Sequence, residues 1–463
     1  MKWAVGQMKV RGYSLNKMIS NLKSAKGDIF ESMFSSAWKM LTREEKQVIF
    51  CMLNYVSTVP KQSLEAASGL SNDIFNDALG KLIWLSLIDT NGELTDERQM
   101  LSMHSLTKSF VYRELQQNSS NGGFNKNLTS LRIANYYLDF VIKNALSGDI
   151  QNGYDRIEVE LQNIMKIIED ISSLAEINHD ITYDNIIIQM GNALSVFLWS
   201  RGFWNYRIKV GEQVIKSANR QCDWKSVGRH AYFIGIVYFW QGNYNESKKW
   251  HSLSRDNREM TGSIFDIALS NRLEALIDVG DEAFDKALLL FEDVLKTISA
   301  DAIATNKDEI AVFADWVVRG ENGYKAGVVS ILQEIGITYN REKEFEKAYK
   351  WLNDSLRLAI EIGDIEGQAV SYSHIGHALF GLQQILKAKR AYRRGYSLAQ
   401  RVQRKSTIAR CSQGLANVYK RMWQNRKAMK YGADALDLFE RLGMREEYDE
   451  VKLILEHPSK IIK

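Results

Sequence analysis

The sequence predicts an all-α protein in which helix pairs stack into a long spiral. Small residues recur 40 positions apart through the second half of the chain, for example at Gly235 and Ala275 and at Gly336 and Gly376. Only two prolines occur among the 463 residues. Because proline removes an amide donor and clashes inside a helix, its scarcity favours long helices joined by tight turns. A helical repeat of this length indicates an α-solenoid.

The composition is that of a soluble globular protein, with 45% apolar and 25% charged residues. No run of about eighteen apolar residues occurs, so we expect no membrane span. The first twenty residues contain no cleavage site of a secretory signal. Cys51, Cys222 and Cys411 lie far apart in no metal-binding spacing, and we expect them to be reduced thiols in the core of a cytoplasmic protein.

Residues 28–115 form the first predicted domain. Thr42 and Glu45 have the spacing of a capping box, in which each side chain satisfies a free amide of the other residue at the start of a helix. An apolar helix is expected to follow this box. A second, short helix is expected at about 62–67, and a third follows the predicted cap Ser71.

The pattern changes to that of a β hairpin over residues 87–103, around the turn Asn91-Gly92. A closing helix is expected to begin near Ser105. Three helices, a hairpin wing and a closing helix make a winged-helix arrangement. The third helix carries Lys81 as its only base, so we do not expect it to enter a DNA groove.

Residues 116–130 are rich in Asn, Gln, Ser and Gly and are predicted to be a linker, because such a segment buries too little apolar surface to offset its ordering entropy. Amphipathic patterns resume in the connecting helices predicted over 131–184. The repeat array is predicted over 185–445, and residues 446–463 are expected to be a C-terminal tail.

Two registers define the array. The first consists of the small residues at which paired helices should approach closely, namely Ser195, Gly235, Ala275, Gly336, Gly376 and Ala416. The second lies twelve residues later, at Arg207, Ser247, Ala287, Ala348, Ala388 and Ala428. Helix axes only about 8–10 Å apart leave room for little more than a methyl group. The one spacing of 61 leaves room for an extra helix at Asp308–Val318, and Gly202, Gly242 and Gly280 are expected in the turns.

The spacing, together with segments such as Ile335-Gly336-x-x-Tyr339 and Ala348-Tyr-Lys-Trp-Leu352, resembles the tetratricopeptide repeat in its longer variant. The large aromatic residue and the closing proline of the consensus are mostly or wholly missing. The resemblance implies a tetratricopeptide-like superhelix whose concave face binds a ligand.

The front of the chain resembles the NB-ARC class of signal transduction ATPases with numerous domains (STAND). Residues 1–23 resemble the helix that follows the Gly-x-Pro motif of that class, so residues 1–27 are interpreted as a remnant helix of its helical domain. The first predicted domain resembles its winged helix and ends in Ser102-Met103-His104-Ser105-Leu106. The class carries Met-His-Asp there, and its His senses the β-phosphate of ADP. The resemblance implies this role for His104, although Ser105 replaces the Asp.

The catalytic half of such an ATPase has no counterpart in this sequence. No G-x-x-x-x-G-K-[ST] motif occurs, so nothing here is expected to hold phosphates. We therefore expect no cofactor in this chain, with ADP or ATP possible in the parent protein, and no enzyme activity of the chain itself. The resemblance implies a regulatory sensor that acts on a nucleotide switch, and oligomer formation on activation is compatible with it. The alternative is a passive protein–protein scaffold.

The strongest chemical signal is a basic segment. No acidic residue occurs between Glu366 and Asp434, whereas fourteen Lys or Arg residues do, so the rest of the chain is net acidic. Such density attracts anions. We expect a ligand-binding set on the concave face made of Lys387, Arg390, Arg393, Arg394, Arg401, Arg404, Lys420 and Arg421. The partner would be a protein or another acidic ligand, or alternatively a nucleic acid. The competing interpretation is a solvated basic face.

His374 and His377 lie three residues apart on a predicted helix, a spacing that can chelate a metal. No third ligand is evident near them in the sequence. We therefore expect no metal site.

Overall fold

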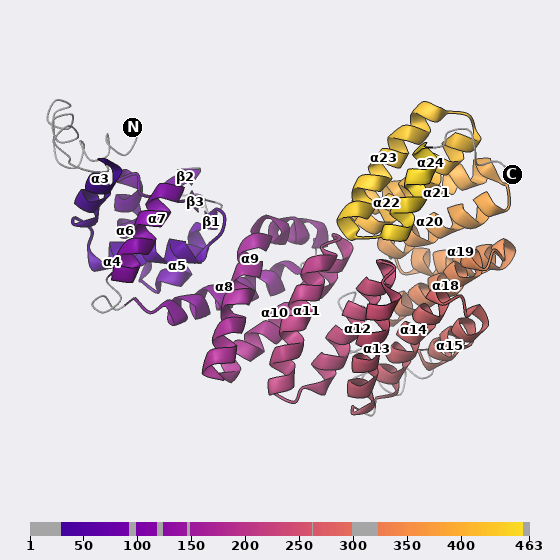
Figure 1. Ribbon diagram of the computed structural model, residues 1–463, viewed down its shortest axis with the longest axis horizontal. Helices are drawn as coiled ribbons and strands as arrows, with labels where there is room; N and C mark the ends of the chain where they lie inside the picture. Colours follow the sequence, from indigo (N-terminus) through magenta and orange to yellow (C-terminus); the bar gives the residue numbers. More distant parts are fainter. Residues whose placement is uncertain are drawn as a thin grey trace. The chain divides into compact units, whose positions relative to one another are not determined.

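The computed structural model describes residues 29–91, 99–117, 124–145, 149–261, 263–298 and 323–456. The chain divides into two compact units, residues 1–190 and 191–463, and each is described by itself (Figure 1). The predicted helices within residues 1–27 and at Asp308–Val318 lie outside the described residues. None of the described helices is long and apolar enough to cross a lipid bilayer.

The first unit begins with helices and a small sheet, in the order expected for a winged helix. The elements are α3 (Ile29–Trp38), α4 (Arg43–Cys51), the 3-10 helix η1 (Met52–Asn54), β1 (Val59–Pro60), α5 (Lys61–Ser68), α6 (Asn72–Trp84), β2 (Asp89–Asn91), β3 (Met100–Ser102) and α7 (Ser105–Gln117). The strands are antiparallel in the order β1-β3-β2, with Leu101 opposite both Val59 and Thr90. Whether this domain belongs to the winged-helix class stays a prediction.

Local capping explains where two of these helices begin. The capping box is present, because the Glu45 amide donates to Thr42 Oγ1 at 3.3 Å and the Thr42 amide donates to Glu45 Oε2 at 2.8 Å. Ser71 also occupies the position before α6, but its side chain makes no capping hydrogen bond. The prediction for Ser71 was therefore right in position and wrong in mechanism.

The predicted linker is shorter than expected. Helix α7 continues to Gln117 and α8 (Lys126–Ala145) begins before residue 130, and α9 (Ile150–Asn178) follows. Asn163 of α9 joins this helix to the turn before β1, since its Oδ1 accepts from the Val56 amide at 3.0 Å and its Nδ2 donates to Thr58 O at 2.9 Å. The connecting helices are thus part of the first unit.

The second unit is a succession of paired helices that runs from left to right in Figure 1, from α10 to α19, which confirms the predicted all-α solenoid. In chain order the helices are α10 (Ile181–Ser200), α11 (Trp204–Arg220), α12 (Trp224–Trp240), α13 (Tyr244–Glu259), α14 (Ile264–Gly280), α15 (Phe284–Thr297), α18 (Gly323–Arg341), α19 (Phe345–Glu361), α20 (Ile365–Gly381), α21 (Ile385–Arg401), α22 (Lys405–Arg421), α23 (Asn425–Leu442) and α24 (Arg445–Glu456). The unit boundary falls within α10. Residues 446–456 of the predicted tail belong to α24, whose Val451 is buried.

The two predicted registers contact each other as expected. All described members of both registers are buried. Ser247 Oγ donates to Gly235 O at 2.9 Å across the pair α12–α13. A Cβ on Gly336 would lie 2.5 Å from Leu352 and 3.4 Å from Ala348 O, and a Cβ on Gly376 would lie 2.7 Å from the ring of Tyr392. The recurring small residues are therefore required by close helix approach.

Replacing Gly376 with leucine should lower the free energy of unfolding by about 1–3 kcal/mol, because the added side chain must displace the buried Tyr392 ring. Gly80 of α6 is the matched control, since no atom lies within 4 Å of a Cβ built there. Gly80→Ala should instead stabilise by about 0.5–1 kcal/mol through helix propensity. Urea titrations followed by circular dichroism measure both, and equal effects would contradict the packing argument.

The turns within pairs use a left-handed residue. Gly202 and Gly242 have φ of 77° and 74°, as predicted. Gly280 does not serve this purpose, because it ends α14 and the left-handed residue of that turn is Glu282, with φ of 62°. Non-glycine residues in this region of φ are uncommon, so the turn shape is imposed by the helix pair and not by the residue type.

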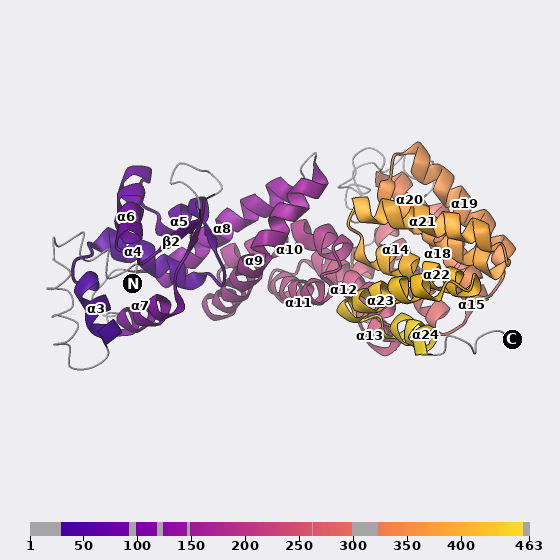
Figure 2. The same ribbon diagram turned by 90° about the horizontal axis from the view of Figure 1, so that it is seen from above.

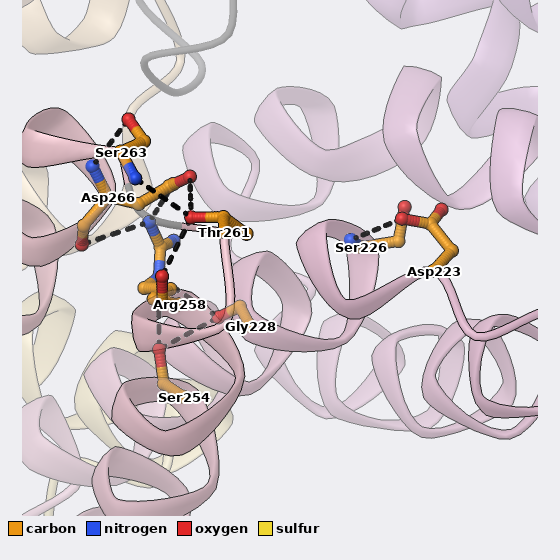
Figure 3. A network of polar contacts seen from close by, with 8 residues as sticks. All are labelled: Asp223, Ser226, Gly228, Ser254, Arg258, Thr261, Ser263 and Asp266. Atoms are coloured by element: carbon orange, nitrogen blue, oxygen red, sulfur yellow. Dashed lines mark hydrogen bonds and ion pairs between the residues drawn. The ribbon is translucent and has the colours of Figure 1, made fainter.

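A buried polar network fixes the connection between α13 and α14 (Figure 3). Arg258 is 2% exposed and its Nη1 donates to Asp266 Oδ1 at 2.6 Å. Thr261 Oγ1 donates to the other Asp266 oxygen at 3.0 Å, and Ser263 caps α14 by accepting from the Asp266 amide. The network joins two successive helix pairs.

Candidate functional site

Whether a residue of a first helix lies on the inner face of the array depends on its position relative to the aligned small residue. Two cavities, described below, are lined by residues of α18, α20 and α22. Relative to the aligned small residue of each helix, most of these residues lie at one of four positions: six, three or two residues before it, or one residue after it. These offsets put them on one side of a helix. In α20 they are Val370, Ser373, His374 and His377. The aligned small residue itself points to the second helix of its pair.

The first cavity has a volume of about 140 Å³ and lies within the second unit. Three tryptophans, Trp199, Trp204 and Trp240, and the ring of Phe233 provide an aromatic wall. Gln333 and Thr407 add polar groups. A cavity of this size accommodates one aromatic ring, since an engineered cavity of about 150 Å³ binds benzene.

Two arginines of the last repeats lie over the tryptophans of the first. The guanidinium of Arg410 is 4.5 Å from the centroid of the Trp240 ring, and that of Arg404 is 5.8 Å from the Trp199 ring. Each also pairs with a carboxylate, Arg410 with Glu447 at 3.1 Å and Arg404 with Glu366. Cation–π contacts of this kind contribute about 0.5–2 kcal/mol each. They fix the arginines as parts of the cavity wall.

A third ion pair of the cavity wall joins α14 and α18. Arg272 donates from Nε and Nη2 to the Glu334 carboxylate at 2.8 and 2.5 Å, a bidentate arrangement. Burial alone would lower the pKa of Arg272, but the adjacent Glu334 carboxylate outweighs it and raises the pKa. This pair is internally neutral, so it shapes the wall without adding net charge.

The second cavity adjoins the first and has a volume of about 280 Å³. Trp240, Ile337, Ser373, His374 and Arg410 line both cavities, so the two are continuous compartments. The second is more polar. Its walls include Asn340, Arg341 and His377 from the first helices and three glutamates from α24, namely Glu446, Glu447 and Glu450.

Contacts between the first and last repeats of the second unit enclose these compartments. Gln241 Nε2 donates to Leu442 O at 3.0 Å, and Tyr244 OH donates to Glu446 at 3.0 Å. Figure 2 shows α24 next to α13. An apolar cluster, which includes Trp204, Phe439 and Leu442, supports the same junction. The array is therefore closed on itself by helices that are about 200 residues apart in sequence.

The predicted basic set does not converge on this face. Of its members, all within the described part of the chain, Arg404 alone lines either of the two cavities. Five members, Lys387, Arg390, Arg393, Arg394 and Arg401, belong to α21, a second helix, and are exposed. Lys420 donates to Ile454 O at 2.8 Å and holds α24, and Arg421 contacts Gln383. The α21 bases thus lie outside the lining of both cavities, although Tyr392 of the same helix lines the second, and their role in ligand binding stays a prediction.

The remaining candidates have ordinary surroundings. His104 is exposed before α7, and its Nδ1 accepts from the Leu106 amide at 3.2 Å. In the part of the chain that the structure describes, no group of three His, Cys, Asp or Glu side chains is arranged to hold a metal ion. The cysteines are free, and Cys51 and Cys411 are buried as expected. Cys222 is exposed in a turn with φ of 56°, so its prediction as a core residue is wrong.

Several residues that line the cavities had no separate prediction. Trp199, Gln333 and Asn340 are examples. A usable signal was present for Gln333, which lies on a first helix three positions before the aligned Gly336, whereas Trp199 and Asn340 lie four positions after an aligned small residue. Charge density alone could not reveal it.

Comparison with known proteins gives a likeness of fold. A STAND protein with a tetratricopeptide repeat sensor from Pyrococcus horikoshii is 14% identical, with coverage of 98% of this chain and 72% of that one and a TM-score of 0.43. NprR in complex with its cognate peptide NprX is 13% identical, with coverage of 76% and 94% and a TM-score of 0.45. Aspartyl phosphate phosphatase F from Bacillus subtilis is 12% identical, with coverage of 77% and 89% and a TM-score of 0.39.

No protein-family model matches the sequence, and no curated protein does. Because the three TM-scores lie below 0.5, the assignment to an all-α solenoid of tetratricopeptide-like pairs rests on the geometry of this chain.

Proposed function

We propose that the second unit is a sensor that binds a short, extended polypeptide segment in the two adjoining cavities. The observation that carries this proposal is that the two cavities are small and lie one after the other along the inner face. Each has the volume of one or a few side chains, about 140 and 280 Å³, and they share a wall of five residues. Most pockets for drug-sized ligands are single spaces of about 300–1,000 Å³. Consecutive small compartments suit consecutive side chains of one strand.

The chemistry of the lining supports the same ligand class. An aromatic wall favours an apolar or aromatic side chain, and the amide oxygens of Gln333 and Asn340 offer acceptors to the N–H groups of a peptide backbone. Rigid helices hold these groups in place, so little ordering entropy is lost on binding.

Selection from a random pentapeptide library displayed against the full chain tests the proposal. Enriched peptides should bind, and Trp240→Ala should weaken their binding at least tenfold, because the substitution removes the aromatic wall and the support of Arg410. Trp423→Ala is the matched control, since Trp423 is 73% exposed and lines neither cavity. The proposal fails if no peptide is enriched, or if both substitutions weaken binding equally.

The resemblance to STAND proteins supports a further part of the proposal, that ligand binding acts on a nucleotide switch in the cytoplasm. A ligand shifts such a switch only if it binds the active arrangement more tightly than the resting one. His104→Ala should then loosen ADP retention in a protein that contains the ATPase domain. Unchanged retention of labelled ADP would contradict the sensor role of His104 and favour the passive scaffold.

A second candidate function belongs to the outer surface of the array. The exposed bases of α21 form a dense row with no acidic residue in that helix. Such a row suits an anionic partner such as a nucleic acid. Binding through about five phosphates would give a log–log salt dependence with a slope near −4.5. Arg393→Glu combined with Arg394→Glu should abolish binding to fluorescein-labelled single-stranded DNA without affecting peptide binding, and a flat salt dependence would contradict this function.

A further inference from the structure

The second cavity contains more hydrogen-bond acceptors and negative charges than its own cations satisfy. Glu447 pairs with Arg410 at 3.1 Å, and Glu446 lies 3.9 Å from Arg341. Glu450 is the third carboxylate of this wall. Its Oε2 accepts from Gln413 Nε2 at 2.8 Å, and no cation of the described chain is paired with it. The two arginines are therefore engaged while one carboxylate remains available to a ligand.

Asn340 provides an independent indication of a missing donor. Its side chain is 3% exposed, and its Oδ1 has no hydrogen-bond partner among the described residues. Its Nδ2 donates to His374 O at 3.1 Å. Because a backbone carbonyl can only accept, this contact fixes the amide orientation and leaves the oxygen directed elsewhere. Buried acceptors without a partner are rare and costly, about 1–3 kcal/mol each, so the site is built for a donor.

The other titratable groups of this cavity do not oppose a cation. Burial lowers the pKa of His374, and the neighbouring Arg410, His377 and Arg341 lower it further. Burial also lowers the pKa of His377. Both imidazoles are thus neutral near pH 7. Three carboxylates then face two guanidiniums, and a positive ligand group would restore balance.

We propose that the second cavity binds a positively charged donor group of the peptide, an ammonium or guanidinium, through Glu450 and Asn340 Oδ1. The proposal deepens the peptide-binding function proposed above and rests on it. The group is either the free N-terminus or a Lys or Arg side chain, since both chemistries provide several N–H donors and one positive charge. The adjoining aromatic cavity would take the neighbouring side chain.

The test uses the pentapeptides selected with the full chain, resynthesised in neutralised forms. One arm acetylates the N-terminus, and the other replaces Lys with acetyl-lysine and Arg with citrulline. We expect one arm to weaken binding at least tenfold in isothermal titration, and the arm identifies the source of the charge. Glu450→Gln should weaken binding of the unmodified peptide similarly, whereas Glu440→Gln, an exposed carboxylate of α23 outside the cavity, should not.

A charge reversal distinguishes recognition from structure. Glu450→Lys should disfavour the cationic peptide and favour its neutralised or succinylated form, which a purely structural role of Glu450 would not produce. Thermal unfolding of each variant shows whether the fold is retained. Tight binding that is indifferent to both neutralisations would overturn this inference and leave the peptide function intact. The absence of any enriched peptide would overturn both.

Discussion

Replacing Arg258 with methionine should lower the free energy of unfolding of the second unit by about 3–5 kcal/mol. The guanidinium is buried and joins three groups that lie on separate segments: Asp266 at 2.6 Å, Ser254 Oγ at 3.1 Å and Gly228 O at 3.3 Å. It also lies over the Tyr232 ring at 5.2 Å. Methionine fills similar space but leaves the Asp266 carboxylate and the Gly228 carbonyl without this donor (Figure 3).

The control for this prediction lies on the same helix. Arg255 also carries an ion pair, with Glu259 at 3.8 Å, but both side chains are about half exposed. Exposed pairs are worth only about 0–1 kcal/mol, so Arg255→Met should have little effect. Chemical denaturation of the two variants measures the difference. A double-mutant cycle with Asp266→Asn should show strong coupling, and additive effects would contradict a role for the ion pair.

The repeat could be predicted from sequence because its determining contact is local. The aligned small residue and its partner lie twelve positions apart, within one helix pair, and the steric requirement repeats with each pair. Ser247 and Gly235 illustrate this, since they join by a hydrogen bond at that separation. The capping box at Thr42 and Glu45 was predictable for the same reason. Contacts between residues close in sequence require particular residue types at fixed spacings, and such spacings can be recognised in the sequence.

The closure of the array could not be predicted in this way. The approach of Arg410 to Trp240, or of Glu446 to Tyr244, depends on curvature that accumulates over every intervening pair. A small change in each helix crossing would separate these residues. Nothing at the individual positions signals such a contact, and for this reason α24 had the appearance of a tail.

The lining of the two cavities was not predicted, because charge was considered without the helix face. Arg393 and Arg394 belong to a second helix, whereas Arg410 belongs to a first helix and lies six positions before Ala416. The offset from the small residue decides whether a side chain lines the cavities. Applied to the sequence alone, this offset would have selected Gln333, Ser373 and His374, and it would have excluded the exposed bases of α21.

Acidification should destabilise the second unit as the pH falls below about 6.5. Burial lowers the pKa of His230 and of His374 well below the usual histidine value, and nearby arginines contribute to both shifts. In the unfolded chain these histidines titrate near 6.5. Below that pH the unfolded state binds protons that the folded state excludes, so the free energy of unfolding declines. The contribution is complete above the unfolded pKa and is lost on acidification.

For every pH unit below 6.5, each of the two histidines should lower the free energy of unfolding by about 1.4 kcal/mol, until the histidine of the folded protein is also protonated. His230→Gln and His374→Gln should flatten the decline between pH 6.5 and 5.5, and His230→Gln keeps a polar group for Asn192, now 3.1 Å from the imidazole Nε2. Comparing slopes between variants cancels the titration of other groups, such as Glu160 and Asp278, whose pKa burial raises. His104→Gln, at an exposed position, is the control. Urea midpoints across this pH range measure the effect, and unchanged slopes in both variants would show that neither imidazole is protonated on unfolding. His374 thus lines both cavities and also contributes to the acid response of the array.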